Sequence, residues 1–169
     1  MKVLETERLV LRRFTVEDDA FIVDLLNDPA WLRFIGDKGV KTLSDARDYL
    51  LKGPIDMYER LGFGAYLTER KSDGVPMGLC GLIKRDALDD IDLGFAFLPP
   101  FRAMGYAYEA ASAVMAYGKR AFGLTRLVAI TSPDNVVSAR LLEKLGFSYE
   151  KMVSLSEGSP EVRLFAAAL

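Results

Sequence analysis

The chain has 169 residues, 50% of them hydrophobic and 27% charged, which suits one globular domain over residues 1–169. Its formal net charge of −2 provides no overall basic field, so we expect neither nucleic acid nor an anionic membrane as a partner. It contains one cysteine, Cys80, and no histidine, which excludes an internal disulfide, Ser-His-Asp and Cys-His nucleophiles and histidine-containing zinc sites.

The first sixty residues predict a strand and two helices. The N-terminus lacks a long apolar stretch, so we expect no secretory signal and no membrane span, and a cytoplasmic location. Residues 9–14 alternate as a strand does, and Thr15 is a helix N-cap before an apolar stripe that ends near Asn27-Asp28-Pro29. Residues 29–43 are expected to be irregular. A second helical pattern covers residues 44–61, with Gly53-Pro54 as a break.

From residue 63 the pattern changes mainly to strands. Residues 63–69, 76–83 and 91–98 predict an antiparallel meander, with a tight turn at 71–74. The next elements are helix 105–122, strand 126–130, helix 138–145, strand 147–152 and strand 162–167.

The predicted order is therefore β-α-α-β-β-β-α-β-α-β-β, with no repeat and no linker. The helix that precedes the apolar strand 126–130 implies a right-handed crossover to a parallel neighbour, whereas the earlier hairpins are antiparallel. We expect a mixed α/β fold with one sheet and helices on its faces.

The segment Arg102-Ala103-Met104-Gly105-Tyr106-Ala107 stands between a predicted strand and a predicted helix. The first amides of a helix have no partner inside it, and small residues let a ligand approach the backbone. Such a segment suits a phosphate or diphosphate. It does not match a Walker motif or a dinucleotide-binding G-x-G-x-x-G. A helix start whose glycine serves packing alone is the other interpretation.

This segment resembles the R/Q-x-x-G-x-G/A diphosphate loop of the GCN5-related N-acetyltransferase superfamily. Three further segments resemble its ribosomal-protein alanine acetyltransferase branch, which includes the RimJ- and RimL-like enzymes, and they occur in family order. They are Thr6-Glu7-Arg8-Leu9-Val10-Leu11-Arg12, then Asp92-Leu93-Gly94-Phe95 followed by Leu98-Pro99-Pro100-Phe101-Arg102 and Gly105-Tyr106-Ala107-Tyr108-Glu109-Ala110, and finally Asn135-Val136-Val137-Ser138 with Leu142-Glu143-Lys144-Leu145-Gly146-Phe147.

The resemblance implies acetyl-CoA as cosubstrate, a primary amine as acceptor, and direct transfer in a ternary complex. It also implies that the strand before the loop splays from its parallel neighbour, and that the pantetheine arm pairs there with the backbone of Phe97 and Leu98. The diphosphate would lie on the amides from Met104 to Ala107, with Arg102 at the rim. Asn135 would contact pantetheine or the amine, and Ser138 would lie near the sulfur.

Two positions depart from the pattern. Ala103 stands where this branch often has a glycine, and its methyl group tightens the loop. Leu142 stands where many superfamily members have a tyrosine acid. This branch commonly lacks that tyrosine too, which leaves Ser138 as the candidate for stabilising the thiolate.

Without histidine, the base that accepts a proton from the amine must be a carboxylate, a lysine, a tyrosine or a relayed water. Asp92 is the first candidate, although it could also be one more solvated acid beside Asp86 and Asp89. Ser138 could instead be only a helix-capping or first-turn residue. Trp31 is the candidate substrate contact. The alternative is that it is a core residue, as aromatic residues commonly are.

The alternatives are a CoA-binding sensor or partner module that has lost catalysis, and an unrelated phosphate-binding α/β protein. No metal is expected. The acceptor stays open between a protein N-terminal amine and a small-molecule amine. The sequence leaves the oligomeric state open, and a homodimer is the commonest arrangement among oligomers.

Overall fold

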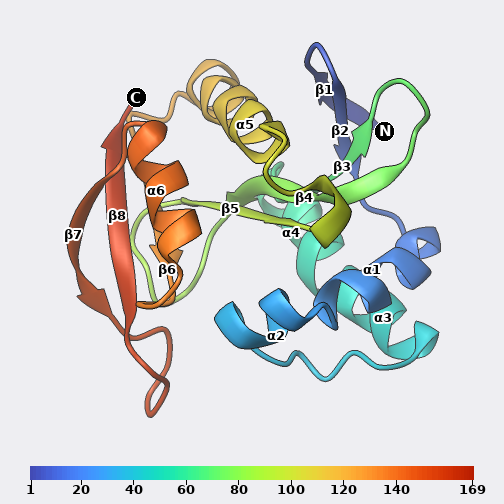
Figure 1. Cartoon of the computed structure of the whole chain (residues 1–169), viewed down its shortest axis with the longest axis horizontal. Helices are drawn as coiled ribbons and strands as arrows, with labels where there is room; N and C mark the ends of the chain where they lie inside the picture. The colour runs from blue at the N-terminus through green and yellow to red at the C-terminus, as the bar shows by residue number, and fades with distance from the viewer.

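The computed structural model describes all residues, 1–169, and contains one eight-stranded mixed sheet (Figure 1). Its strands are β1 (Lys2–Glu5), β2 (Leu9–Arg13), β3 (Ala65–Arg70), β4 (Pro76–Ile83), β5 (Asp92–Phe97), β6 (Arg126–Thr131), β7 (Ser148–Val153) and β8 (Val162–Ala168). They lie in the order β1-β2-β3-β4-β5-β6-β8-β7, and β5 and β6 are the one parallel pair. The expected mixed α/β fold is confirmed.

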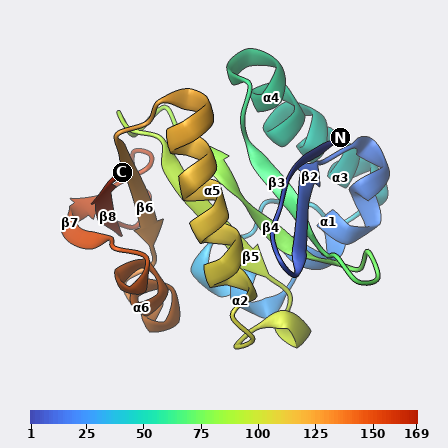
Figure 2. The same cartoon turned by 90° about the horizontal axis from the view of Figure 1, so that it is seen from above.

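Six α-helices surround this sheet. They are α1 (Asp19–Leu26), α2 (Pro29–Phe34), α3 (Leu43–Leu50), α4 (Asp56–Leu61), α5 (Tyr106–Phe122) and α6 (Val136–Lys144). Helix α5 lies on one face of the sheet against β4 and β5, whereas α1, α2 and α3 lie on the opposite side (Figures 1 and 2). Helix α6 lies beside β6. No helix is long and apolar enough to cross a membrane.

The expected splay of the central strands is present. Strands β5 and β6 share a single register pair, Asp92 with Val128, and the Val128 amide donates to the Ile91 carbonyl at 3.0 Å. This contact lies at the start of β5, and no pairing continues toward its C-terminal end. The second half of β5 therefore has a paired neighbour only on its β4 side.

Two expectations about the N-terminal half are wrong in detail. Residues 29–43 are not wholly irregular, because Asp28 accepts hydrogen bonds from the amides of Ala30 and Trp31 and starts α2, with Pro29 at the first helical position. Strand β1 was also missed. It is a short edge strand that pairs with β2.

Gly53-Pro54 does not break the second helical region. Leu51–Ile55 forms a π-helical turn that joins α3 to α4, and it absorbs the proline. The region ends instead at Gly62, in a left-handed conformation with φ of 80°. The helical region from α3 to α4 is therefore continuous.

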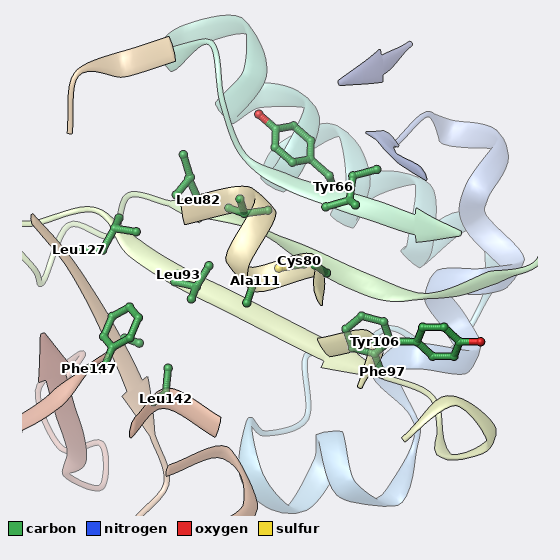
Figure 3. Close-up of a cluster of buried hydrophobic side chains, with 14 of the residues drawn as sticks. Tyr66, Cys80, Leu82, Leu93, Phe97, Tyr106, Ala111, Leu127, Leu142 and Phe147 are labelled. Carbon is green, nitrogen blue, oxygen red and sulfur yellow. The ribbon is translucent and has the colours of Figure 1, made fainter. Parts of the chain in front are cut away.

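The largest group of buried side chains joins α5 to the sheet. Leu93 and Phe97 of β5 lie in this cluster with Tyr106 of α5 and Leu127 of β6 (Figure 3). Cys80 is fully buried there, and burial raises the pKa of its thiol. Cys80 therefore serves as a small core residue. The cluster holds the start of α5 against the end of β5.

Candidate active site

The turn between β5 and α5 presents a row of free backbone amides. The Arg102 amide donates to the Pro99 carbonyl, and the next bonded amide is that of Glu109, which donates to the Gly105 carbonyl at 3.0 Å. The six amides between them, residues 103 to 108, have no acceptor in the protein. This is the arrangement that an anion requires.

Two left-handed residues shape this turn. Ala103 has φ of 60°, the only positive φ outside glycine, and Gly105 has φ of 81°. Such residues turn successive N–H groups toward one side and form an anion-binding concavity. The positive end of the α5 dipole adds to it. The loop therefore keeps its shape at the expense of one strained alanine.

Replacing Ala103 by glycine should stabilise the protein. Relief of the left-handed strain outweighs the added freedom of the unfolded chain, for a net gain of about 0.5–1 kcal/mol and a rise of about 2 °C in Tm. Ala107→Gly is the matched control, because Ala107 lies inside α5, where glycine lowers stability. Thermal unfolding of both variants checks this. Equal losses of stability would contradict the assigned role of Ala103.

Arg8 and Glu109 brace the loop from outside. Arg8 Nε donates to Glu109 Oε1 at 2.8 Å, and Arg8 Nη1 donates to the Met104 carbonyl at 3.1 Å. The Arg8 guanidinium also lies 4.3 Å from the centre of the Tyr106 ring. Glu109 accepts further bonds from the Thr6 hydroxyl and the Arg8 amide. Glu109 therefore has a structural role beside the loop, and sequence reasoning did not single out Arg8 because its partners lie about a hundred residues away.

Glu109→Gln should raise the KM for acetyl-CoA several-fold and leave kcat nearly unchanged. Burial raises the Glu109 pKa, but hydrogen bonds from Thr6 and Arg8 outweigh it and leave the pKa below its usual range. A lowered pKa means that this carboxylate stabilises the fold above the unfolded value of about 4.3. The stability gap between wild type and variant should therefore shrink as pH falls below that value. Denaturant unfolding at pH 7 and pH 3.5 checks this, and a constant gap would contradict it.

Arg102 is placed differently from the expectation. Its Nε donates to the Phe97 carbonyl at 2.9 Å, and its Nη2 pairs with Oδ2 of the buried Asp28. Asp28 also caps α2. Arg102 therefore ties the loop to β5 and to α2 rather than presenting a free charge at the rim, and Asp28 is a second positioning residue that the sequence did not reveal.

On the side of β5 that has no paired strand beyond Asp92, the backbone groups belong to Phe95 and Phe97 and not to Leu98. The Leu98 amide donates to the Met77 carbonyl at 2.9 Å, and the Leu98 carbonyl accepts from the Phe101 amide at 3.0 Å, so neither is free. Because neighbouring residues of a strand direct their backbone groups to opposite sides, Phe95 and Phe97 face away from β4. The Leu98 backbone is therefore not free to pair with a ligand, whereas the Phe95 backbone is.

Two adjoining cavities open along this side. The larger, of about 580 Å³, reaches the loop residues Arg102, Ala103, Gly105, Tyr106 and Ala107. The smaller, of about 280 Å³, reaches Asp92. Both are lined by Trp31, Phe34, Ile35, Phe95, Ala96, Asn135 and Ser138. Of the expected site residues, only Leu98 and the half-exposed Met104 line neither cavity.

Asn135 and Ser138 lie at the junction of the cavities. Asn135 Oδ1 accepts from the Ser138 amide at 3.2 Å, so Asn135 is the N-cap and α6 begins at Val136. Ser138 is thus a first-turn residue and not a cap. Its hydroxyl forms no hydrogen bond with the protein and remains available at the junction.

Asp92 is not one of the solvated acids of the preceding connection. It is 1% exposed, and Arg85 Nε donates to its Oδ2 at 2.6 Å, while Oδ1 has no partner. Burial raises its pKa, although Arg85 opposes the shift. Asp92 lines the smaller cavity, and its unpaired, buried oxygen with a raised pKa makes this carboxylate a candidate proton acceptor.

Trp31 belongs both to the core and to the cavities. It is 7% exposed and packs with the residues under α1 and α3, yet it lines both cavities, and its indole Nε1 has no acceptor. The two interpretations of Trp31 are therefore compatible.

Comparison with known proteins is consistent with this geometry. Residues 8–148 match the model of the acetyltransferase (GNAT) domain family. The uncharacterized N-acetyltransferases YnaD and YoaA of Bacillus subtilis are 29% and 30% identical over 87% and 88% of the chain, covering 83% and 84% of their own lengths. A putative GNAT-family acetyltransferase from Bordetella pertussis superposes with a TM-score of 0.81 at 26% identity, covering 99% of this chain and 100% of that one. A RimL ribosomal L7/L12 α-N-protein acetyltransferase in complex with CoA gives 0.83 at 17% identity, covering 100% and 98%.

Proposed function

The chain belongs to the GNAT acetyltransferase family, and we propose that it moves an acetyl group from acetyl-CoA directly to a primary amine in a ternary complex. The observation that carries this proposal is the row of free amides from 103 to 108, at the end of a cavity that joins a second cavity with an unpaired carboxylate oxygen. One compartment suits the CoA diphosphate, and the other suits the acceptor.

The residues present fit acetyl-CoA. The amides of residues 103 to 108 would hold the diphosphate, and the free backbone of Phe95 together with the Phe97 amide would pair with the pantetheine arm. Acetyl-CoA supplies an activated acetyl group. Asn135 and Ser138 lie where the two compartments meet, and they would contact the end of the arm.

Two side chains would assist the reaction, one by accepting a proton and the other by donating a hydrogen bond. An amine attacks only when it is neutral, and Asp92 Oδ1 would accept its proton from the wall of the smaller cavity. The raised pKa of Asp92 suits this role. The Ser138 hydroxyl would donate a hydrogen bond to the departing sulfur. Trp31 lines both compartments and would contact the acceptor.

The experiment that tests this function combines acetyl-CoA calorimetry with thiol release over N-terminal peptides, polyamines, aminoglycosides and free amino acids. We expect micromolar binding and thiol release that depends on an amine. Binding without release on any amine would favour the sensor alternative, and binding of a nucleotide instead of CoA would favour the unrelated phosphate-binding protein.

Ser138→Ala should lower kcat about 10- to 100-fold, which is the loss expected for one hydrogen bond to a charged group. The unfolding free energy should stay within about 0.5 kcal/mol of wild type, because Asn135 is the cap and keeps its bond to the unchanged amide. Single-turnover rates and denaturant unfolding check both parts. An unchanged rate would remove Ser138 from the chemistry.

A further inference from the structure

The smaller cavity carries more positive than negative charge. Its charged lining residues are Lys38, Arg85 and Asp92, two cations and one anion. Asp92 is already paired with Arg85, so the Lys38 charge has no counterpart in the wall. An amine without a negative group arrives as a cation and is not attracted electrostatically by such a wall. An acceptor that brings its own negative charge does.

Arg85 is held ready for an anion. Its Nε is engaged by Asp92 at 2.6 Å, whereas its two terminal nitrogens have no protein partner, and the side chain is 34% exposed. Asp92 thus fixes the orientation of the guanidinium, and its outer fork remains free. This fork matches the two oxygens of a carboxylate.

Lys38 lies close enough to Arg85 for the two charges to interact. Its ammonium group forms no hydrogen bond and no ion pair with the protein, although it lines the same cavity. Burial and then repulsion from Arg85 lower the Lys38 pKa. An anion bound between the two cations would relieve this repulsion, which favours its binding further.

The rest of the lining limits the size and polarity of the acceptor. The cavity has a volume of about 280 Å³, and apolar side chains such as Trp31, Met57 and Leu79 form most of its wall. It has room for a small molecule and offers few hydrogen bonds to a polar body. Polycations such as polyamines and aminoglycosides match neither the charge nor the lining.

On the basis of the acetyltransferase function proposed above, we propose that the acceptor is a free amino acid, a small amine whose own carboxylate binds between Arg85 and Lys38. Its α-amino group then lies on the side of Asp92 Oδ1 and the cavity junction, and an apolar side chain occupies the remaining wall. In the transfer, the amine nitrogen forms the amide bond as the carbon–sulfur bond of the thioester breaks. Asp92 takes the proton from the attacking amine, and CoA leaves as its thiolate, which accepts a hydrogen bond from the Ser138 hydroxyl.

The test compares the free amino acids with their C-terminal amides, which keep the amine and lose the charge. Thiol release should be at least tenfold faster, as kcat/KM, for the preferred apolar amino acid than for its amide. Calorimetry with the CoA-loaded enzyme should show the same preference in binding, whether or not turnover occurs. Lys38→Met should reduce the ratio of acid to amide at least fivefold, and Lys38→Arg should restore most of it.

Lys52→Met is the matched control, because Lys52 is an exposed lysine that lines neither cavity, and this variant should keep the wild-type ratio. Equal or faster reaction of the amides, or of N-terminal peptides, would overturn the amino-acid assignment while leaving the acetyltransferase function in place. Absence of transfer to any amine would contradict the function itself. Calorimetry would then test the amino-acid site on its own. Equal binding of the free amino acid and its C-terminal amide would overturn that site.

Discussion

Gly105→Ala is expected to raise the dissociation constant of acetyl-CoA by at least tenfold. Gly105 has φ of 81°, and a Cβ there would lie 3.3 Å from Nη2 of Arg8, the residue that holds the Met104 carbonyl. The substitution therefore opposes the backbone turn that directs amides 103 to 108 to one side, and it displaces the arginine that braces it. Loss of even half of the amide–phosphate bonds accounts for this effect. Isothermal titration with acetyl-CoA measures it.

Gly123→Ala is the matched control at the other end of the same helix. Gly123 is also left-handed, with φ of 64°, and a Cβ there would meet nothing within 4 Å. Both variants should lose about 1 kcal/mol of stability, because both place alanine in a left-handed conformation. Only Gly105→Ala should lose affinity. Similar affinities in the two variants would show that the loop shape does not determine CoA binding.

Asp92→Asn is expected to lower kcat/KM for the amine by about 10²–10⁴, the usual contribution of a positioned general base. Asparagine keeps the shape and can still accept a hydrogen bond from Arg85, but it cannot take a proton. Burial raises the Asp92 pKa against the opposing charge of Arg85. Wild-type activity should therefore rise with pH as Asp92 loses its proton, and this part of the rise should be missing from the variant. Profiles of kcat/KM between pH 5 and pH 9 measure the difference.

Asp89→Asn makes the same chemical change three residues away on an exposed aspartate that lines neither cavity. It should leave rate and pH profile unchanged. If Asp92→Asn kept the wild-type rate at every pH, Asp92 would act only by orienting Arg85. In that case the pKa of the acceptor amine would set the profile by itself.

The local parts of this site could be predicted from the sequence. The break between β5 and α5, the glycine at 105 and the N-terminal amides of a helix depend on neighbouring residues alone, and the structure shows them as expected. The last two strands and the C-terminal glycine of α5 follow in the same way. Patterns of this kind carry their own physical cause within a few residues.

The long-range parts could not be predicted. The pairing of Arg8 with Glu109 and of Arg102 with Asp28 joins segments whose contact depends on the packed sheet. That the Phe95 backbone is free and the Leu98 backbone is not depends on which side of β5 faces β4, and this needs the register and not only the strand. Helix α2 has six residues, too few for an apolar period to stand out. Asp28-Pro29 is the available signal, but the same pair also fits the end of the preceding helix.

A crystal structure of the protein grown with saturating CoA tests the central claim most directly. The account predicts that the diphosphate oxygens lie within hydrogen-bonding distance of amides from residues 103 to 108, with the pantetheine arm running along Phe95 and Phe97 toward Ser138. A diphosphate bound elsewhere, or a loop whose amides stay without a ligand under those conditions, would contradict it.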